Sequence, residues 1–122
     1  MRTILVVDDF APFRTRARAL LEAAGWDVVG EAADGRSAVD GASSLRPDVV
    51  LLDVGLPDLD GFEVTAALRH TGSASTVVLM SSRDARSYGP RIAASGAAGF
   101  LPKDELSGTA LAAIVDGAII DP

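Results

Sequence analysis

The chain has no cysteine, so neither disulfide bonds nor thiolate metal ligands can contribute to its fold or chemistry. Aromatic residues make up only 5% of its 122 residues, so its core must be built mainly from Val, Leu, Ile and Ala. Its apolar runs are far shorter than the roughly 20 residues that a membrane-spanning helix needs. The 48% hydrophobic fraction is nevertheless ordinary for a globular fold, which argues against disorder.

Positive charge is also scarce, with 11 Lys and Arg against 17 Asp and Glu and a net charge of −6. Three arginines alternate at positions 14, 16 and 18 of one predicted helix, which spreads them around it instead of forming a basic stripe. We therefore expect this chain to bind no nucleic acid itself. The first three residues lead directly into a strand-length aliphatic run, unlike a signal peptide. The expectation is a cytoplasmic protein without membrane contact.

Short aliphatic runs alternate with longer Ala-rich amphipathic stretches along the chain. The runs predict five strands, at 3–7, 27–32, 49–53, 76–81 and 99–103. The stretches predict five helices, at 12–24, 35–44, 61–70, 90–95 and 105–117. Strands that alternate with helices on short connections predict a parallel sheet with right-handed crossovers. The expectation is one α/β domain over residues 1–122, with the polar strand 27–32 near an edge of the sheet.

Polar side chains follow four of the predicted strands at the points where those strands end. They are Asp8 and Asp9, Asp53, Ser81, and Lys103. In an open parallel α/β sheet, the carboxyl ends of the strands form one crevice, which is where ligands bind. Carboxylate oxygens suit Mg²⁺, and a hydroxyl and an ammonium can bind an anionic group beside the metal. The sequence therefore predicts a site for a divalent cation and a phosphoryl group.

Each of these residues also has a purely structural interpretation. Asp8 and Asp9 could form a solvated turn or cap a helix, and Asp53 could be a turn residue before Pro57. A single serine or lysine at a strand end is usually just solvated. Three carboxylates at one place, however, repel each other strongly unless a cation lies between them. A structural role alone does not explain that cost, which favours the metal site.

Four segments together carry a resemblance to a known family. They are Val6-Val7-Asp8-Asp9, Leu52-Asp53 with Pro57-Asp58-Leu59-Asp60-Gly61, Met80-Ser81-Ser82, and Gly96-Ala97-Ala98-Gly99-Phe100-Leu101-Pro102-Lys103. With these segments in this order and spacing, the chain resembles the receiver domain of two-component response regulators from end to end. The stretch Lys103-Asp104-Glu105-Leu106 is similar to receivers of the NarL/LuxR type, which usually carry a C-terminal helix-turn-helix domain. The resemblance implies a flavodoxin-like, doubly wound sheet of order 2-1-3-4-5.

The resemblance also implies a role for each residue of the site. Asp53 corresponds to the phosphoacceptor. The implied ligands of Mg²⁺, for which Mn²⁺ could substitute, are Asp9 directly, Asp8 largely through water, Asp53, and the backbone carbonyl of Gly55. The implied phosphoryl-binding and switch residues are Ser81 (a hydroxyl that moves), Phe100 (an aromatic ring that turns) and Lys103 (an amine that binds a phosphoryl oxygen).

The implied mechanism is attack of the Asp53 carboxylate on a phosphohistidine of a partner histidine kinase. The acyl phosphate would draw Ser81 inward and allow Phe100 to turn, which shifts the face made by the fourth helix, fifth strand and fifth helix. Homodimerisation and control of transcription through a further DNA-binding domain are possible outputs. Such a receiver is an enzyme only in catalysing its own phosphorylation and dephosphorylation.

Three other functions stay open at this point. One is a receiver-like interaction module that never carries phosphate. Another is a flavodoxin-like cofactor binder, which the acidic loop after the first strand disfavours because acids repel a nucleotide phosphate. The third is an aspartyl-phosphate phosphatase, disfavoured because Gly55 occupies the position of its second acid. The residue after Lys103 is Asp104, where many receivers have a cis proline, so we expect either a trans bond or a strained loop there.

Overall fold

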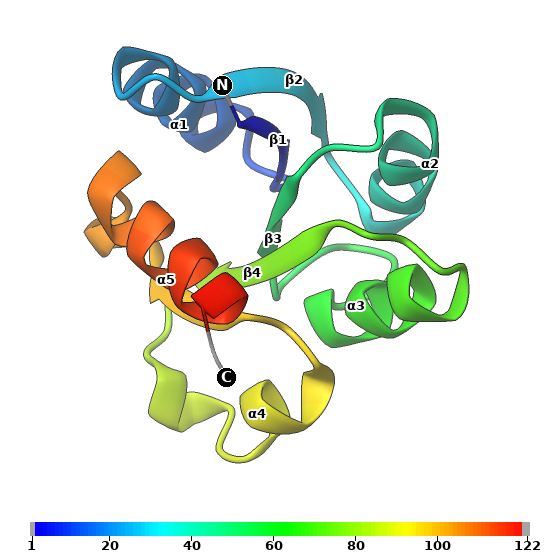
Figure 1. The fold of residues 1–122 in the computed structure, drawn as a ribbon. Helices are drawn as coiled ribbons and strands as arrows, with labels where there is room; N and C mark the ends of the chain where they lie inside the picture. Colours follow the sequence, from blue (N-terminus) through cyan, green and yellow to red (C-terminus); the bar gives the residue numbers. More distant parts are fainter. Residues whose placement is uncertain (1, 121–122) are drawn as a thin grey trace.

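Five parallel strands form the centre of the molecule in the order β2-β1-β3-β4-β5 (Figure 1). The computed structural model describes residues 2–120. The strands are β1 (Thr3–Val7), β2 (Asp27–Ala32), β3 (Val49–Asp53), β4 (Thr76–Ser81) and β5 (Gly99–Pro102). The predicted flavodoxin-like strand order is confirmed, and the polar strand β2 lies at an edge of the sheet as expected.

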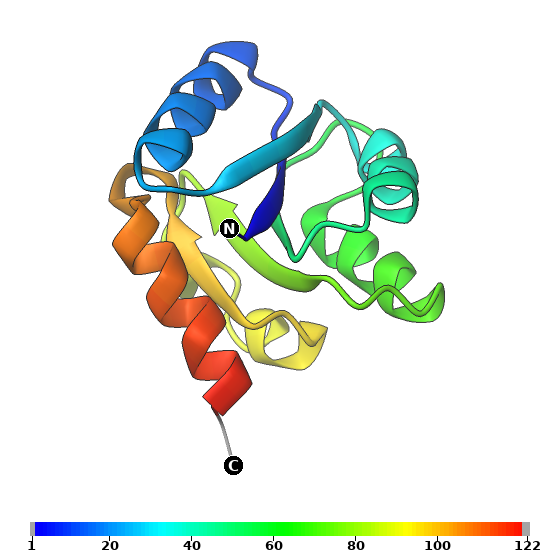
Figure 2. The ribbon, with the colours of Figure 1, turned by 45° about the horizontal axis from the view of Figure 1, so that its top comes forward.

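Four α-helices connect the strands, a fifth follows β5, and together they cover both faces of the sheet. They are α1 (Ala11–Ala23), α2 (Gly35–Leu45), α3 (Gly61–His70), α4 (Arg91–Ser95) and α5 (Gly108–Ile120). Figures 1 and 2 show α1 and α5 on one side of the sheet and α2, α3 and α4 on the other. Two short 3₁₀ helices, at Ala85–Ser87 and Lys103–Glu105, precede α4 and α5.

The sheet separates two hydrophobic cores because successive strand residues point to opposite faces. Ile4 and Val6 of β1 belong to the core shared with α1 and α5. Leu5 and Val7 belong to the core shared with α2 and α3. Every residue of β3 is buried, which explains why this central strand is a continuous apolar run that ends in Asp53.

Local sequence signals account for the helix starts. Pro12 lies in the first turn of α1, where a missing N–H costs nothing. The carboxylate of Asp34 accepts a hydrogen bond from the Ser37 N–H (2.8 Å) at the start of α2. Asp60 and Glu63 form a reciprocal capping box at the start of α3. The third helix therefore begins directly after the loop that follows Asp53.

The end of the chain differs from the sequence-based prediction. The fifth strand ends at Pro102 instead of Lys103, and the last helix begins at Gly108 instead of Glu105. Residues 103–105 form a 3₁₀ turn, and Leu106 is then extended and buried in the core under α1 and α5. Ser107 then caps the last helix, with its Oγ accepting a hydrogen bond from the Ala110 N–H (3.0 Å).

Two further findings concern the described residues, 2–120. They contain no cis peptide bond, so the bond between Lys103 and Asp104 is trans. None of their helices is long and apolar enough to cross a membrane.

Candidate functional site

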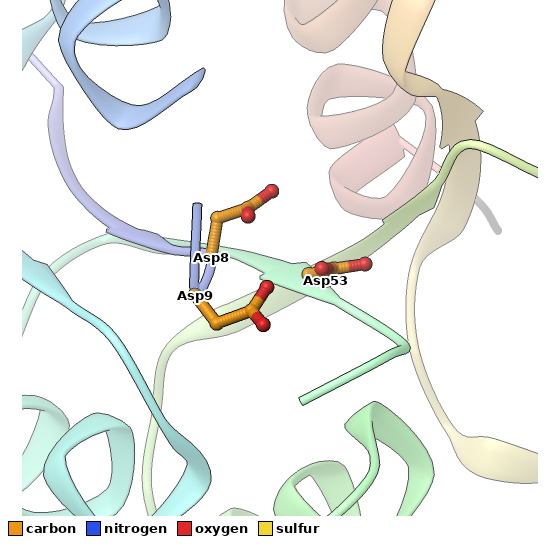
Figure 3. A group of neighbouring side chains, drawn as sticks. All are labelled: Asp8, Asp9 and Asp53. Carbon is orange, nitrogen blue, oxygen red and sulfur yellow. The ribbon is translucent and has the colours of Figure 1, made fainter. Parts of the chain in front are cut away.

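Three carboxylates meet where β1 and β3 end. Asp8 and Asp9 follow β1, and Asp53 is the last residue of β3. The two strands are neighbours, with Val7 in register with Leu52. One oxygen from each carboxylate lies within 4.8 Å of the others, and Figure 3 shows the three side chains together at the strand ends. Asp8 and Asp53 are buried, whereas Asp9 is exposed.

The ammonium of Lys103 joins this group from the end of β5. Its Nζ lies 2.6 Å from Asp8 Oδ2 and 3.2 Å from Asp53 Oδ2. Burial alone would lower the pKa of Lys103, but the neighbouring carboxylates of Asp8 and Asp53 raise it on balance. Lys103 is therefore held as a cation between two acids.

The carboxyl of Asp53 has a raised pKa. Burial is the largest cause, and the nearby charge of Asp8 adds to it. Lys103 and the N–H of Gly55, which donates to Asp53 Oδ1 at 3.2 Å, act in the opposite direction. A further positive charge at this site would favour the ionised form of Asp53.

The chemistry of the site fits a hard divalent cation. Asp8 Oδ1 accepts a hydrogen bond from the Phe10 N–H (2.8 Å). Asp8 Oδ2 is buried, and its charged neighbour is the ammonium of Lys103 at 2.6 Å. Three carboxylates with oxygens close together, and access to water through exposed Asp9, make a donor set that suits Mg²⁺.

Ser81 and Phe100 lie at the same edge of the sheet, but neither joins the acidic group. Ser81 is buried at the end of β4, and its Oγ lies 2.6 Å from the Tyr88 hydroxyl. It also accepts a hydrogen bond from the Arg83 N–H (3.0 Å). Within residues 2–120, it makes no hydrogen bond to Asp53. Phe100 is half-buried in β5 and packs against Tyr88, with ring centroids 5.8 Å apart.

Two residues around the site were missed by sequence reasoning. Tyr88 lies in the segment between the 3₁₀ turn and α4, whose course the Gly89-Pro90 pair leaves undetermined. Arg14 donates from Nη1 to the backbone carbonyl of Asp8 (2.6 Å) and from Nε to Glu31 (3.1 Å). The only signal for Arg14 is its place one helical turn beyond the start of α1, which does not distinguish it from a surface arginine.

The loop after Asp53 is anchored to α2 by another unpredicted contact. The carboxylate of Asp58 accepts hydrogen bonds from the N–H groups of Gly35 (2.7 Å) and Arg36 (3.0 Å). The Gly35 N–H is the largest cause of a lowered pKa of Asp58. The start of α2 thus binds a carboxylate, as helix N-termini favour, and the loop that carries Gly55 is tied to it.

Comparison with known proteins identifies the family. The family model described as the response regulator receiver domain matches residues 4–115. The chain belongs to the response regulator receiver family. This receiver is 38% identical over 116 residues to the nitrate/nitrite response regulator protein NarP of Escherichia coli, covering 94% of the chain and 54% of NarP. The receiver domain of the putative response regulator NarL from Mycobacterium tuberculosis superposes with a TM-score of 0.87 at 36% identity, over 98% of this chain and 97% of that one.

NarP and NarL confirm the NarL-type subgroup that the sequence resembles. The receiver is also 36% identical over 102 residues to the Bordetella pertussis protein named virulence factors putative positive transcription regulator BvgA, covering 84% of the chain and 49% of BvgA. The chain spans about half the length of the curated relatives it matches.

Proposed function

We propose that this receiver accepts a phosphoryl group on the carboxylate of Asp53 in the presence of Mg²⁺. The observation that carries the proposal is the position of Asp53, which is buried beside Asp8 with the ammonium of Lys103 3.2 Å away. A nucleophilic carboxylate, a cation that can bind a phosphoryl oxygen and additional acids for a metal are the parts that phosphoryl transfer requires.

The proposed reaction begins from a phosphohistidine of a partner histidine kinase. An oxygen of Asp53 attacks the phosphorus, the P–N bond breaks, and the electron pair of that bond leaves with the imidazole. The product on this chain is an acyl phosphate. Lys103 would bind an oxygen of the transferred group, and its position beside Asp53 is already set by β5.

The ligands that would hold Mg²⁺ are Asp8, Asp9, Asp53 and the backbone carbonyl of Gly55. The bound metal would supply neutralisation of the negative charge on the carboxylates and the phosphoryl oxygens. The roles of Ser81 as the switch hydroxyl and of Phe100 as the aromatic that follows it belong to the same proposal.

The proposed output is control of transcription. NarP is named a nitrate/nitrite response regulator and BvgA a putative positive transcription regulator, and the chain covers about half of each. We propose that the phosphorylated receiver shifts the face made by α4, β5 and α5, that this favours a homodimer, and that a DNA-binding domain beyond this chain responds. A cytoplasmic location stays part of this proposal.

The test is intact-mass analysis after incubation with Mg²⁺ and a small phosphodonor. We expect the wild-type chain to gain one phosphoryl group and to gain none when Mg²⁺ is chelated. Asp53→Asn should gain none, whereas Asp40→Asn, which removes an exposed acid on α2, should behave as the wild type does.

The same experiment separates the alternatives. Full labelling of Asp53→Asn would place the phosphoacceptor elsewhere. No labelling of the wild type under conditions where Mg²⁺ binds would favour an interaction module that works without phosphate.

A further inference from the structure

Tyr88 contacts both the Ser81 hydroxyl and an aromatic cluster. Its hydroxyl lies 2.6 Å from Ser81 Oγ. Its half-buried ring packs against Phe62 of α3 and Phe100 of β5, with centroid distances of 5.7 and 5.8 Å. The aromatic residue that is hydrogen-bonded to Ser81 is therefore Tyr88.

Two of the three hydrogen-bonding directions of the Ser81 hydroxyl are in use. A serine hydroxyl has one proton to donate and two lone pairs. Ser81 Oγ accepts from the Arg83 N–H at 3.0 Å, and the short contact to Tyr88 occupies a second direction. A separation of 2.6 Å lies at the short end for O–H···O bonds, so the bond is well formed, and a movement of Ser81 by about 1 Å away from Tyr88 would take it beyond hydrogen-bonding distance.

Tyr88 is also bonded to the start of α4. Its backbone carbonyl accepts a hydrogen bond from the Arg91 N–H at 3.3 Å. The guanidinium of Arg91 lies over the ring of Phe62, 4.2 Å from its centroid, and pairs with Asp60 at 3.4 Å. A displacement of Tyr88 would therefore disturb the first turn of α4 and the contacts that join α4 to α3.

We propose that Tyr88 is a positioning residue that holds the Ser81 hydroxyl while Asp53 carries no phosphoryl group, and that links Ser81 to α4. The proposal rests on the proposed function, because it concerns how Ser81 becomes able to bind a phosphoryl oxygen on Asp53. Formation of that bond breaks the Ser81–Tyr88 bond, and the released phenol alters the packing of Phe100 and the start of α4. The Tyr88 hydroxyl thus stabilises the unphosphorylated arrangement.

The first test needs neither metal nor phosphoryl group. Tyr88 is the only tyrosine in the chain, so ring-labelled tyrosine gives NMR signals of Tyr88 alone. Ser81→Ala should shift these signals, because it removes the hydrogen-bond partner of the phenol. Ser82→Ala, at the exposed neighbouring position, should leave them in place. Unshifted signals in Ser81→Ala would mean that the Ser81–Tyr88 bond does not exist in solution, and the proposal would fail.

The second test removes only the phenol oxygen. Tyr88→Phe keeps the ring and its packing, and urea unfolding in EDTA checks that the variant folds as stably as the wild type. Calorimetric titration with trifluoroberyllate and Mg²⁺, which mimic the phosphoryl group, should give about fivefold tighter binding in Tyr88→Phe, since one net hydrogen bond no longer has to be broken. Equal or weaker binding would overturn the proposal.

A third measurement connects the two tests. On addition of trifluoroberyllate and Mg²⁺ to the wild type, the Tyr88 signals should move toward those of Ser81→Ala, because both changes release the phenol. Binding of trifluoroberyllate with unmoved Tyr88 signals would overturn the link while leaving the proposed function intact. Failure of the wild type to bind trifluoroberyllate would instead overturn the proposed function. It would also overturn the proposed change of hydrogen-bond partner of Ser81, from Tyr88 to a phosphoryl oxygen.

Discussion

The ammonium of Lys103 lies 2.6 Å from the carboxylate of Asp8, which is fully buried. Lys103 is the only lysine in the chain, and it comes to Asp8 from the far end of the sequence at the end of β5. The same ammonium contacts Asp53. One lysine therefore provides the neighbouring positive charge for two buried acids, close to the position where a metal ion would act.

Lys103→Met should lower the free energy of unfolding by about 2 kcal/mol in EDTA. The reason is that removal of one partner leaves a buried charge without compensation, at a site where partial solvent access reduces the full cost. Mg²⁺ should restore more stability to the variant than to the wild type, because the metal replaces the lost charge. Urea unfolding with and without Mg²⁺ measures both effects.

Arg86→Met is the matched control, since Arg86 is 94% exposed. Its free energy of unfolding should stay within about 0.5 kcal/mol of the wild type. An equal gain from Mg²⁺ in Lys103→Met and in the wild type would contradict a shared role of lysine and metal.

Arg14→Gln should weaken Mg²⁺ binding about tenfold, because groups that orient metal ligands matter nearly as much as the ligands themselves. Arg14 donates to the backbone carbonyl of Asp8 and is itself held by Glu31. Arg16→Gln makes the same change of charge on the same helix, at an exposed position whose guanidinium lies over the Phe13 ring. Calorimetric titration with Mg²⁺ should give a lower affinity for Arg14→Gln than for Arg16→Gln. Equal affinities of the two variants would mean that Arg14 acts only through its charge and not by orienting Asp8.

Glu31 should contribute stability that depends on pH. Its hydrogen bond with Arg18 is the largest cause of its lowered pKa, and Arg14 adds to it. A carboxyl with a lowered pKa in the folded state stabilises the fold fully above its ordinary pKa of 4.5 and loses this contribution as the pH falls through the folded-state value. The difference in free energy of unfolding between the wild type and Glu31→Gln should be below about 1 kcal/mol at neutral pH, because the pair is partly exposed.

That difference should shrink as the pH is lowered below the ordinary value. Urea unfolding at a series of pH values measures it, and added salt should reduce it at neutral pH. A difference that stays constant down to acid pH would assign the effect of Glu31→Gln to packing instead of charge.

Gly61→Ala should destabilise the fold at the site. A Cβ on Gly61 would lie 2.8 Å from the backbone oxygen of Asp53 and 2.8 Å from the Cα of Val54, so backbone must move to admit it. The expected loss is about 1–3 kcal/mol. Gly117→Ala in α5, where a Cβ meets no atom within 4 Å, should instead raise the free energy of unfolding by about 0.5–1 kcal/mol. Urea unfolding of both variants measures these changes. A higher free energy of unfolding in Gly61→Ala would contradict the close approach of Gly61 to the backbone of Asp53 and Val54.

Most elements could be predicted because their patterns are local. The run that ends in Asp53 is apolar at every position, since β3 is covered on both faces. The strand 27–32 is more polar because it lies at an edge. The predicted start of the last helix was wrong because Ser107 caps this helix: its Oγ accepts a hydrogen bond from the Ala110 N–H at 3.0 Å. This serine is a local signal that the prediction did not use.

The site could be predicted where it follows from strand ends. Parallel strands bring their carboxyl ends to one edge, so Asp8, Asp9, Asp53 and Lys103 were expected together, and the structure places them together. Ser81 was expected at the same edge, but its bond to Tyr88 was not. That bond depends on the path of a loop whose conformation has no strong sequence signal.

By itself, the sequence determined the alternation of strands and helices and the edge that carries the acids, because alternating hydrophobic patterns and short connections permit few parallel folds. Its motifs also carried the resemblance to the receiver family, and that resemblance implied the order of the strands. Only the tertiary structure decided which partner each polar group takes: Lys103 between Asp8 and Asp53, Arg14 on the Asp8 carbonyl, and Tyr88 on Ser81. The physical reason is the separation of the interacting residues along the chain. Secondary structure follows from residues close together in the chain, whereas these contacts require packing of segments that only the completed fold brings within hydrogen-bonding distance.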